Sequence, residues 1–168
     1  MKTLIQSGDI ISHAEMSVAE GVHLQKGMNF RLRSGASVLL MSVRRGAPYD
    51  DEIQEGGRVL IYEGHDAPRT AGTPDPKTLD QPESSPNGRP TQNRLFYEAA
   101  LRFKHGKGPA EPVRVYEKIR DGIWAFNGVF RLVDAWKERR GGRTVFRFRL
   151  ATEGRRSGQA SSAPAGTG

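Results

Sequence analysis

The chain has 168 residues, enough for one domain that buries its own core without a disulfide or metal staple. It contains no cysteine, which excludes thiol catalysis, disulfide chemistry and cysteine-type zinc sites. The formal net charge is +7, and no apolar run approaches the roughly 20 residues of a membrane span.

The basic charge is unevenly distributed. Residues 46–98 carry ten acidic and five basic residues, whereas residues 99–168 carry fifteen basic and six acidic ones. Such a surface favours a polyanionic partner, most often nucleic acid, although general solubility alone gives a similar composition. No basic amphipathic helix indicates an anionic membrane surface. With no apolar leader near residue 1, we expect a cytoplasmic, nucleoid-associated protein.

The first half of the chain predicts two strands and a long loop. Residues 37–43 form a short apolar run that predicts a buried strand, and residues 58–62 predict a second one. An acidic loop, closed by Gly56 and Gly57, lies between them. Residues 64–90 are polar and rich in proline, so we expect a loop that is either functional or disordered.

The second half predicts one helix and then strands. Thr91 is suited to cap a helix whose apolar residues recur at helical spacing up to Phe103. Residues 113–119, 129–136 and 145–150 are strand-like, and in the last of these Arg147 and Arg149 alternate with apolar residues, which predicts a cationic outer face. Residues 153–168 are rich in Gly, Ala and Ser and predict a flexible C-terminal tail. The sum is an α+β domain over residues 1–152: a curved β-sheet or barrel with one or two packing helices.

Two tyrosines bracket the acidic loop. Tyr49-Asp50-Asp51-Glu52-Ile53 is followed by Arg58-Val59-Leu60-Ile61-Tyr62. Two aromatic rings and a carboxylate in one strand–loop–strand unit suit a flat base with an exocyclic amine, because cytosine N4 donates naturally to Asp or Glu and rings stack on bases. A base in a duplex reaches such a site only when it is flipped out of the stack.

Six motifs in order resemble the SRA (SET- and RING-associated, or YDG) domain family, in its bacterial stand-alone or restriction-associated form. They are Gly21-Val22-His23, Tyr49-Asp50-Asp51-Glu52-Ile53, Val59-Leu60-Ile61-Tyr62-Glu63-Gly64, Thr91-Gln92-Asn93-Arg94-Leu95, Phe126-Asn127-Gly128 and Val145-Phe146-Arg147-Phe148-Arg149-Leu150. Glu63, Glu52, Phe126 and Asn127 depart from the residues common in the family.

The resemblance implies a PUA-like barrel that flips 5-methylcytosine out of double-stranded DNA into an aromatic pocket, without catalysis, cofactor or metal. By position, Tyr49 and Tyr62 would stack on the base, and the pocket acid falls at Glu52, with Asp51 one residue away. The backbone near Gly46 and Ala47 would contact the rest of the base. The expected DNA contacts are Gln25 and Lys26, in the segment after His23, and five arginines: Arg31, Arg33, Arg44, Arg45 and Arg69.

Other interpretations stay open at this point. The acidic loop could be a metal or hydrolase site, although no spacing enforces one. The four histidines are scattered and form no zinc pair or nuclease core. The chain could also be the targeting domain of a modification-dependent HNH restriction endonuclease whose nuclease lies elsewhere, with that nuclease as its partner. An RNA-binding PUA-like module and a small-molecule-binding barrel are further alternatives.

Overall fold

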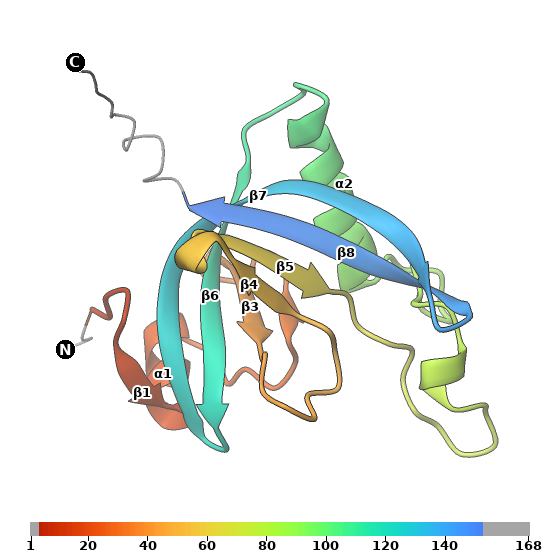
Figure 1. Ribbon diagram of the computed structural model, residues 1–168, viewed down its shortest axis with the longest axis horizontal. Helices are drawn as coiled ribbons and strands as arrows, with labels where there is room; N and C mark the ends of the chain where they lie inside the picture. Colours follow the sequence, from red (N-terminus) through yellow and green to blue (C-terminus); the bar gives the residue numbers. More distant parts are fainter. Residues whose placement is uncertain (1–3, 153–168) are drawn as a thin grey trace.

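A computed structural model describes residues 4–152, and the predicted tail at 153–168 lies outside them. One strongly curved sheet of eight strands forms the body, with two helices packed against it (Figure 1). The strands are β1 (Ile10–Ser12), β2 (Met28–Asn29), β3 (Ser37–Met41), β4 (Glu52–Gln54), β5 (Val59–Glu63), β6 (Glu111–Arg120), β7 (Ile123–Arg140) and β8 (Arg143–Thr152). The helices are α1 (His13–Glu20) and α2 (Gln92–Lys104), and short 3₁₀ turns occupy Glu55–Gly57 and Pro76–Thr78. The predicted α+β class is confirmed.

The sheet runs in the order β2-β3-β6-β7-β8-β5-β4, and β1 pairs with β7. The β3–β6 pair is parallel and the other pairs are antiparallel. The long strands β7 and β8 bend across the molecule and connect the two halves of the sheet (Figure 1). A register shift between Leu132 and Asp134 marks an irregularity in β7, of the kind that increases the local twist of a strand.

Helix α2 covers the concave side of the sheet. Its N-cap is Thr91, whose hydroxyl accepts a hydrogen bond from the backbone N–H of Arg94, as the sequence predicts. Phe96, Ala99 and Ala100 are buried on the side of α2 that packs against the strands. Full burial of an apolar side chain such as Phe96 stabilises the fold by about 1.5–3 kcal/mol.

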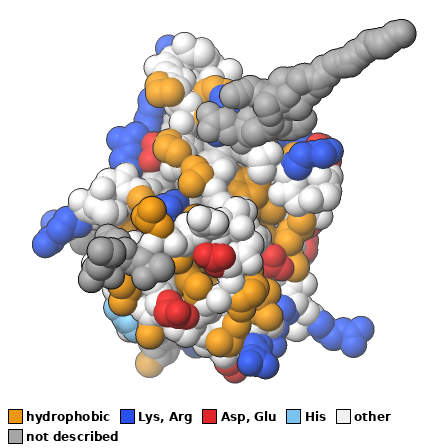
Figure 2. Space-filling view, turned by 90° about the vertical axis from the view of Figure 1, so that its left-hand side faces the viewer, with side chains coloured by type: hydrophobic (Ala, Val, Ile, Leu, Met, Phe, Trp, Pro, Cys, Tyr) orange, Lys and Arg blue, Asp and Glu red, His pale blue; other side chains and the backbone are white. Residues whose placement is uncertain are grey.

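Helix α1 was not predicted. It begins at a capping box, in which the Glu15 N–H donates to Ser12 Oγ (3.1 Å) and the Ser12 N–H donates to Glu15 Oε1 (2.8 Å). It ends at Gly21, whose φ of 75° suits glycine. Figure 2 looks onto the side that carries α1 and β1, where Ile10 and Val18 are 61% and 63% exposed.

The long polar loop at residues 64–90 contains only a 3₁₀ turn and one isolated bridge, Ser84 to Pro90, in agreement with the prediction. Among residues 4–152, no helix has the length and apolar character to cross a membrane.

Candidate functional site

The end of β3 meets β4 and β5 through side-chain hydrogen bonds. The Ser42 N–H donates to Asp51 Oδ2 (3.1 Å), and the Glu63 N–H donates to Asp51 Oδ1 (2.9 Å). The Tyr62 hydroxyl donates to the Leu40 carbonyl (3.1 Å). We call this junction the seam. Because its backbone groups are joined by side chains rather than by a strand ladder, it leaves room for cavities.

Two cavities flank the seam. The first, the tyrosine cavity, has a volume of about 430 Å³. Its lining includes Tyr49, Tyr62 and Asp51 together with Gln25, Gly27, Leu40, Met41, Ser42, Ala47, Pro48, His13, His23, Leu24, Lys118 and Trp124. The structure therefore brings the two predicted tyrosines and one of the two candidate acids to a single cavity.

Tyr62 is held rigidly. It is only 5% exposed, belongs to the main core cluster and anchors its hydroxyl on Leu40. Gly27 lies against it so closely that a Cβ at this position would be 2.5 Å from the Tyr62 hydroxyl oxygen. Tyr49, by contrast, lies on the loop before β4 and is half-buried. One wall of the tyrosine cavity is thus part of the core, and the other is a loop side chain.

Asp51 is the acid at the tyrosine cavity. Burial raises the pKa of Asp51 to about 7, and the hydrogen bonds from the backbone N–H groups of Glu63 and Ser42 only partly oppose this effect. A carboxyl group with this pKa is present in both its protonated and its ionised form near neutral pH. Its ionised form can accept a hydrogen bond from an amine that enters the cavity.

Glu52, the other candidate acid, points elsewhere. It pairs with Ile61 across β4 and β5, so it lies on the face opposite to that of the neighbouring Tyr62. Its carboxylate accepts a hydrogen bond from Arg147 (2.9 Å), whose side chain is 2% exposed. Arg147 also donates to the Asp50 carbonyl (2.6 Å). The predicted cationic outer face is therefore wrong at Arg147, because β4 and its preceding loop cover that face.

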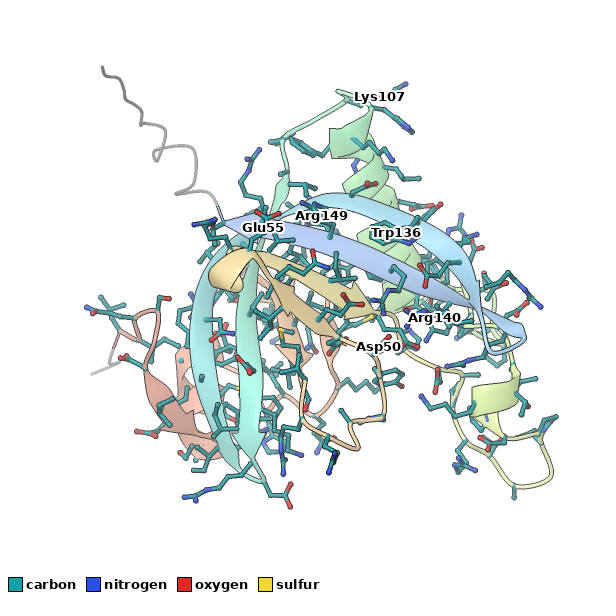
Figure 3. The ribbon with its side chains drawn as sticks, viewed as in Figure 1. Asp50, Glu55, Lys107, Trp136, Arg140 and Arg149 are labelled. Carbon is teal, nitrogen blue, oxygen red and sulfur yellow. The ribbon has the colours of Figure 1, made fainter. Side chains whose placement is uncertain are left out.

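The second cavity, the arginine cavity, has a volume of about 500 Å³. Its charged lining residues are Arg44, Asp50, Asp51, Glu63, Lys77, Arg140 and Arg143. Arg140, the last residue of β7, pairs with Asp50 (Figure 3). Tyr49 lines both cavities.

The predicted DNA-contact residues separate into two groups, all exposed. Gln25 lines the tyrosine cavity, Lys26 adjoins it in sequence, and Arg44 lines the arginine cavity beside Arg45. Gly46 lines the arginine cavity and Ala47 lines both.

Arg31 and Arg33 do not join this group. They lie in the turn between β2 and β3, at the end of β3 away from the seam. Arg31 is bound to Glu111 through two guanidinium nitrogens, at 2.8 and 3.2 Å. Arg69 is 74% exposed and pairs with Asp75 in the long loop.

Two groups of residues beside the cavities were not predicted from the sequence. Asp66, Lys77, Gln81 and Arg143 form a network behind Tyr49, since Gln81 and Arg143 both donate to Asp66 and Lys77 pairs with it. Only the proline-rich composition of residues 64–90 hinted at a function for that loop. Trp124 is half-buried and lines the tyrosine cavity with the edge-to-face pair His13 and His23.

Within residues 4–152, no group of three or more His, Asp or Glu side chains is placed to hold a metal ion. The acids of the loop instead have separate protein partners: Asp50 pairs with Arg140, Glu52 pairs with Arg147, and Asp51 accepts from the N–H groups of Ser42 and Glu63.

Solved structures with a similar fold include the following proteins. The SRA domain of SUVH5 in a complex with hemi-methylated CG DNA is 19% identical, with a TM-score of 0.60 over 90% of this chain and 91% of that one. The same domain bound to fully hydroxymethylated CG DNA gives the same identity, TM-score and coverage. SUVH6 of Arabidopsis thaliana in complex with SAM is 17% identical, with a TM-score of 0.54 over 88% of this chain and 25% of that one. No family model and no curated protein matches the sequence.

The chain therefore has the fold of an SRA domain, as the order of its motifs predicts.

Proposed function

We propose that this chain binds double-stranded DNA containing 5-methylcytosine and takes the modified base out of the helix into the tyrosine cavity. The observation that carries the proposal is the convergence of Tyr49, Tyr62 and the Asp51 carboxyl on one cavity. The likeness to SRA domains solved with methylated and hydroxymethylated DNA supports the choice of ligand.

Each group has a role that its chemistry supports. Tyr62, fixed in the core, and Tyr49, on the opposite loop, offer ring surface to the base, and stacking stabilises a bound base by about 1–3 kcal/mol. Asp51 accepts the N4 amine, which distinguishes cytosine from thymine because thymine carries an acceptor at that position. Together these contacts offset the few kcal/mol needed to unstack and unpair the base.

Phosphate contacts supply most of the affinity in this proposal. Gln25, Lys26, Arg44 and Arg45 are exposed beside the two cavities. Their contacts with phosphate and groove position the duplex without reading its sequence. Arg31 is a weaker candidate because Glu111 already occupies its guanidinium group.

The test measures affinity for one duplex in its plain, 5-methyl and 5-hydroxymethyl forms at one salt concentration. Burial of the methyl group contributes about 0.8 kcal/mol, so we expect the 5-methyl form to bind about fourfold more tightly than the plain form. Tyr49→Ala should remove this preference and leave the weak binding to plain DNA. Equal affinity of the wild type for all three duplexes would reject the proposal.

The proposed role is binding without catalysis. Incubation of methylated duplex with this chain and a divalent metal tests that point, since strand cleavage would make the chain an enzyme. The resemblance also predicts that an HNH nuclease on the same or a neighbouring chain could work together with this domain, and this stays a prediction.

A further inference from the structure

The ring of Tyr49 has a cation on one face. The Lys77 ammonium nitrogen lies 4.3 Å from the ring centroid. Lys77 lines the arginine cavity, Tyr62 lines the tyrosine cavity, and Tyr49 lines both. Lys77 lines only the arginine cavity, so the ring face that Lys77 leaves uncovered is the one that a base in the tyrosine cavity would use.

The same ammonium group also holds the chain beside the ring. It pairs with Asp66 Oδ2 at 2.9 Å and donates to the carbonyl of Pro48, the residue before Tyr49. The Asp66 backbone N–H donates to the Tyr49 hydroxyl (3.2 Å). Lys77 and Asp66 therefore hold the ring face, the hydroxyl and the preceding carbonyl of Tyr49.

These two residues are anchored to the sheet. Asp66 accepts hydrogen bonds from Arg143 (2.9 Å) and Gln81 (3.1 Å). Burial alone would raise the pKa of Asp66, but hydrogen bonds from Lys77, Arg143 and Gln81 outweigh it and lower that pKa. Arg143 also donates to the Pro76 carbonyl (3.2 Å), which fixes the 3₁₀ turn that carries Lys77.

Tyr49 needs this support because of where it lies. It belongs to the loop before β4, outside any strand ladder, and it lines both cavities. Without Lys77, rotation about its side-chain bonds could carry the ring toward the arginine cavity and widen the tyrosine cavity. A stacking surface that is already in place loses less conformational entropy when the base arrives.

We propose that Lys77, held by Asp66, is a positioning residue that fixes the stacking face of Tyr49, so that the loop at residues 64–90 sets the preference for the modified base. This inference rests on the proposed function. It assigns the long loop at residues 64–90 a part in base choice.

The decisive experiment compares Lys77→Met, Lys77→Arg and Lys107→Ala with the wild type on plain and 5-methyl duplexes over a range of salt. We expect Lys77→Met to lower the roughly fourfold ratio of methylated to plain affinity about twofold, the effect of losing an exposed cation–π contact. The slope of affinity against salt should stay unchanged. Lys77→Arg should keep the wild-type ratio of methylated to plain affinity, because a guanidinium group also packs on an aromatic ring. Lys107, which follows the C-terminal end of α2 and lies far from Asp50, is the control (Figure 3).

A phosphate contact would give a different pattern. If Lys77 only neutralised a phosphate, Lys77→Met would weaken both duplexes equally and reduce the salt slope by about one ion. That result would overturn the inference.

A second measurement separates this inference from the proposed function. In the free protein, nuclear Overhauser contacts between the Lys77 side chain and the Tyr49 ring should be present, and the ring resonances should shift in Lys77→Met but not in Lys77→Arg. Absence of those contacts in the wild type would overturn the positioning role, whatever the DNA measurements give. A wild type without preference for methylated DNA, but with the contacts intact, would refute the proposed function and the base-choice role of Lys77 with it, leaving only its hold on the ring.

Discussion

The proton on Asp51 makes the stability of the fold depend on pH in a way that can be measured. The pKa of Asp51 is raised by burial to about 7 from its ordinary 3.8. Between these two values the folded protein keeps a proton that the unfolded chain has released. This contribution to stability is therefore fully present below pH 4 and is lost as the pH rises through 7.

The perturbation is Asp51→Asn, which removes the titrating group and keeps the shape. The amide oxygen can replace one carboxylate oxygen, whereas the amide NH₂ faces a backbone donor, so the variant loses one hydrogen bond at every pH. This constant cost cancels when the difference between wild type and variant is followed with pH. A shift of about three pKa units then predicts that the difference in unfolding free energy falls by about 2–3 kcal/mol between pH 5 and pH 8.

The assay is urea unfolding of both proteins at half-unit pH steps from 5 to 8. Other titrating groups contribute equally to both proteins and drop out of the difference. We expect the wild type to lose its advantage over the variant steadily, most steeply between pH 5 and 7. A difference that stays flat over this range would mean that Asp51 ionises normally and is solvated, and the reasoning about the acid at the tyrosine cavity would fail.

Three further predictions follow from the same contacts. Gly27→Ala should cost about 1–3 kcal/mol of unfolding free energy, because its Cβ would meet the Tyr62 hydroxyl and the Leu40 carbonyl; a urea midpoint equal to that of the wild type contradicts this packing. Glu52→Ala should lower the free energy of unfolding by about 1–3 kcal/mol, because it removes an acceptor from the buried Arg147. It should leave base choice unchanged. Loss of discrimination against thymine in this variant would show that Glu52, not Asp51, is the pocket acid. Affinity for duplex DNA should fall about 10³-fold or more between 50 and 200 mM salt if six or more phosphates are contacted, and a flat response would exclude a phosphate-based interface.

Local patterns in the sequence were enough to predict most of the elements. The helix after Thr91 buries one face, so helical periodicity identifies it. Ser37–Met41 is buried on both sides and is identified by its continuous apolar run, and β8 by the apolar residues that alternate along it. Helix α1 was missed because its apolar face is small, with Met16 as its only buried apolar residue. Its capping box of Ser12 and Glu15 was the signal that could have revealed it.

Contacts between distant segments were not predictable in the same way. The position of Lys77 over Tyr49 depends on the path of the loop at residues 64–90, and no local pattern in a proline-rich loop encodes that path. The burial of Arg147 depends on which segment covers β8, and alternation along one strand does not determine what lies above it.

The choice between Asp51 and Glu52 shows how a single register decides a chemical role. Successive strand residues face opposite sides of a sheet, and residues directly opposite each other in an antiparallel pair face the same side. Glu52 is opposite Ile61, so it lies on the side away from Tyr62. There its carboxylate pairs with the buried Arg147. Asp51, one residue earlier, falls on the side of Tyr62. A slip of one residue in the β4–β5 pairing would exchange the two acids, so that Glu52 would face the tyrosine cavity and the shorter Asp51 side chain would face Arg147. The observed register therefore gives Arg147 the longer carboxylate and leaves Asp51 at the tyrosine cavity.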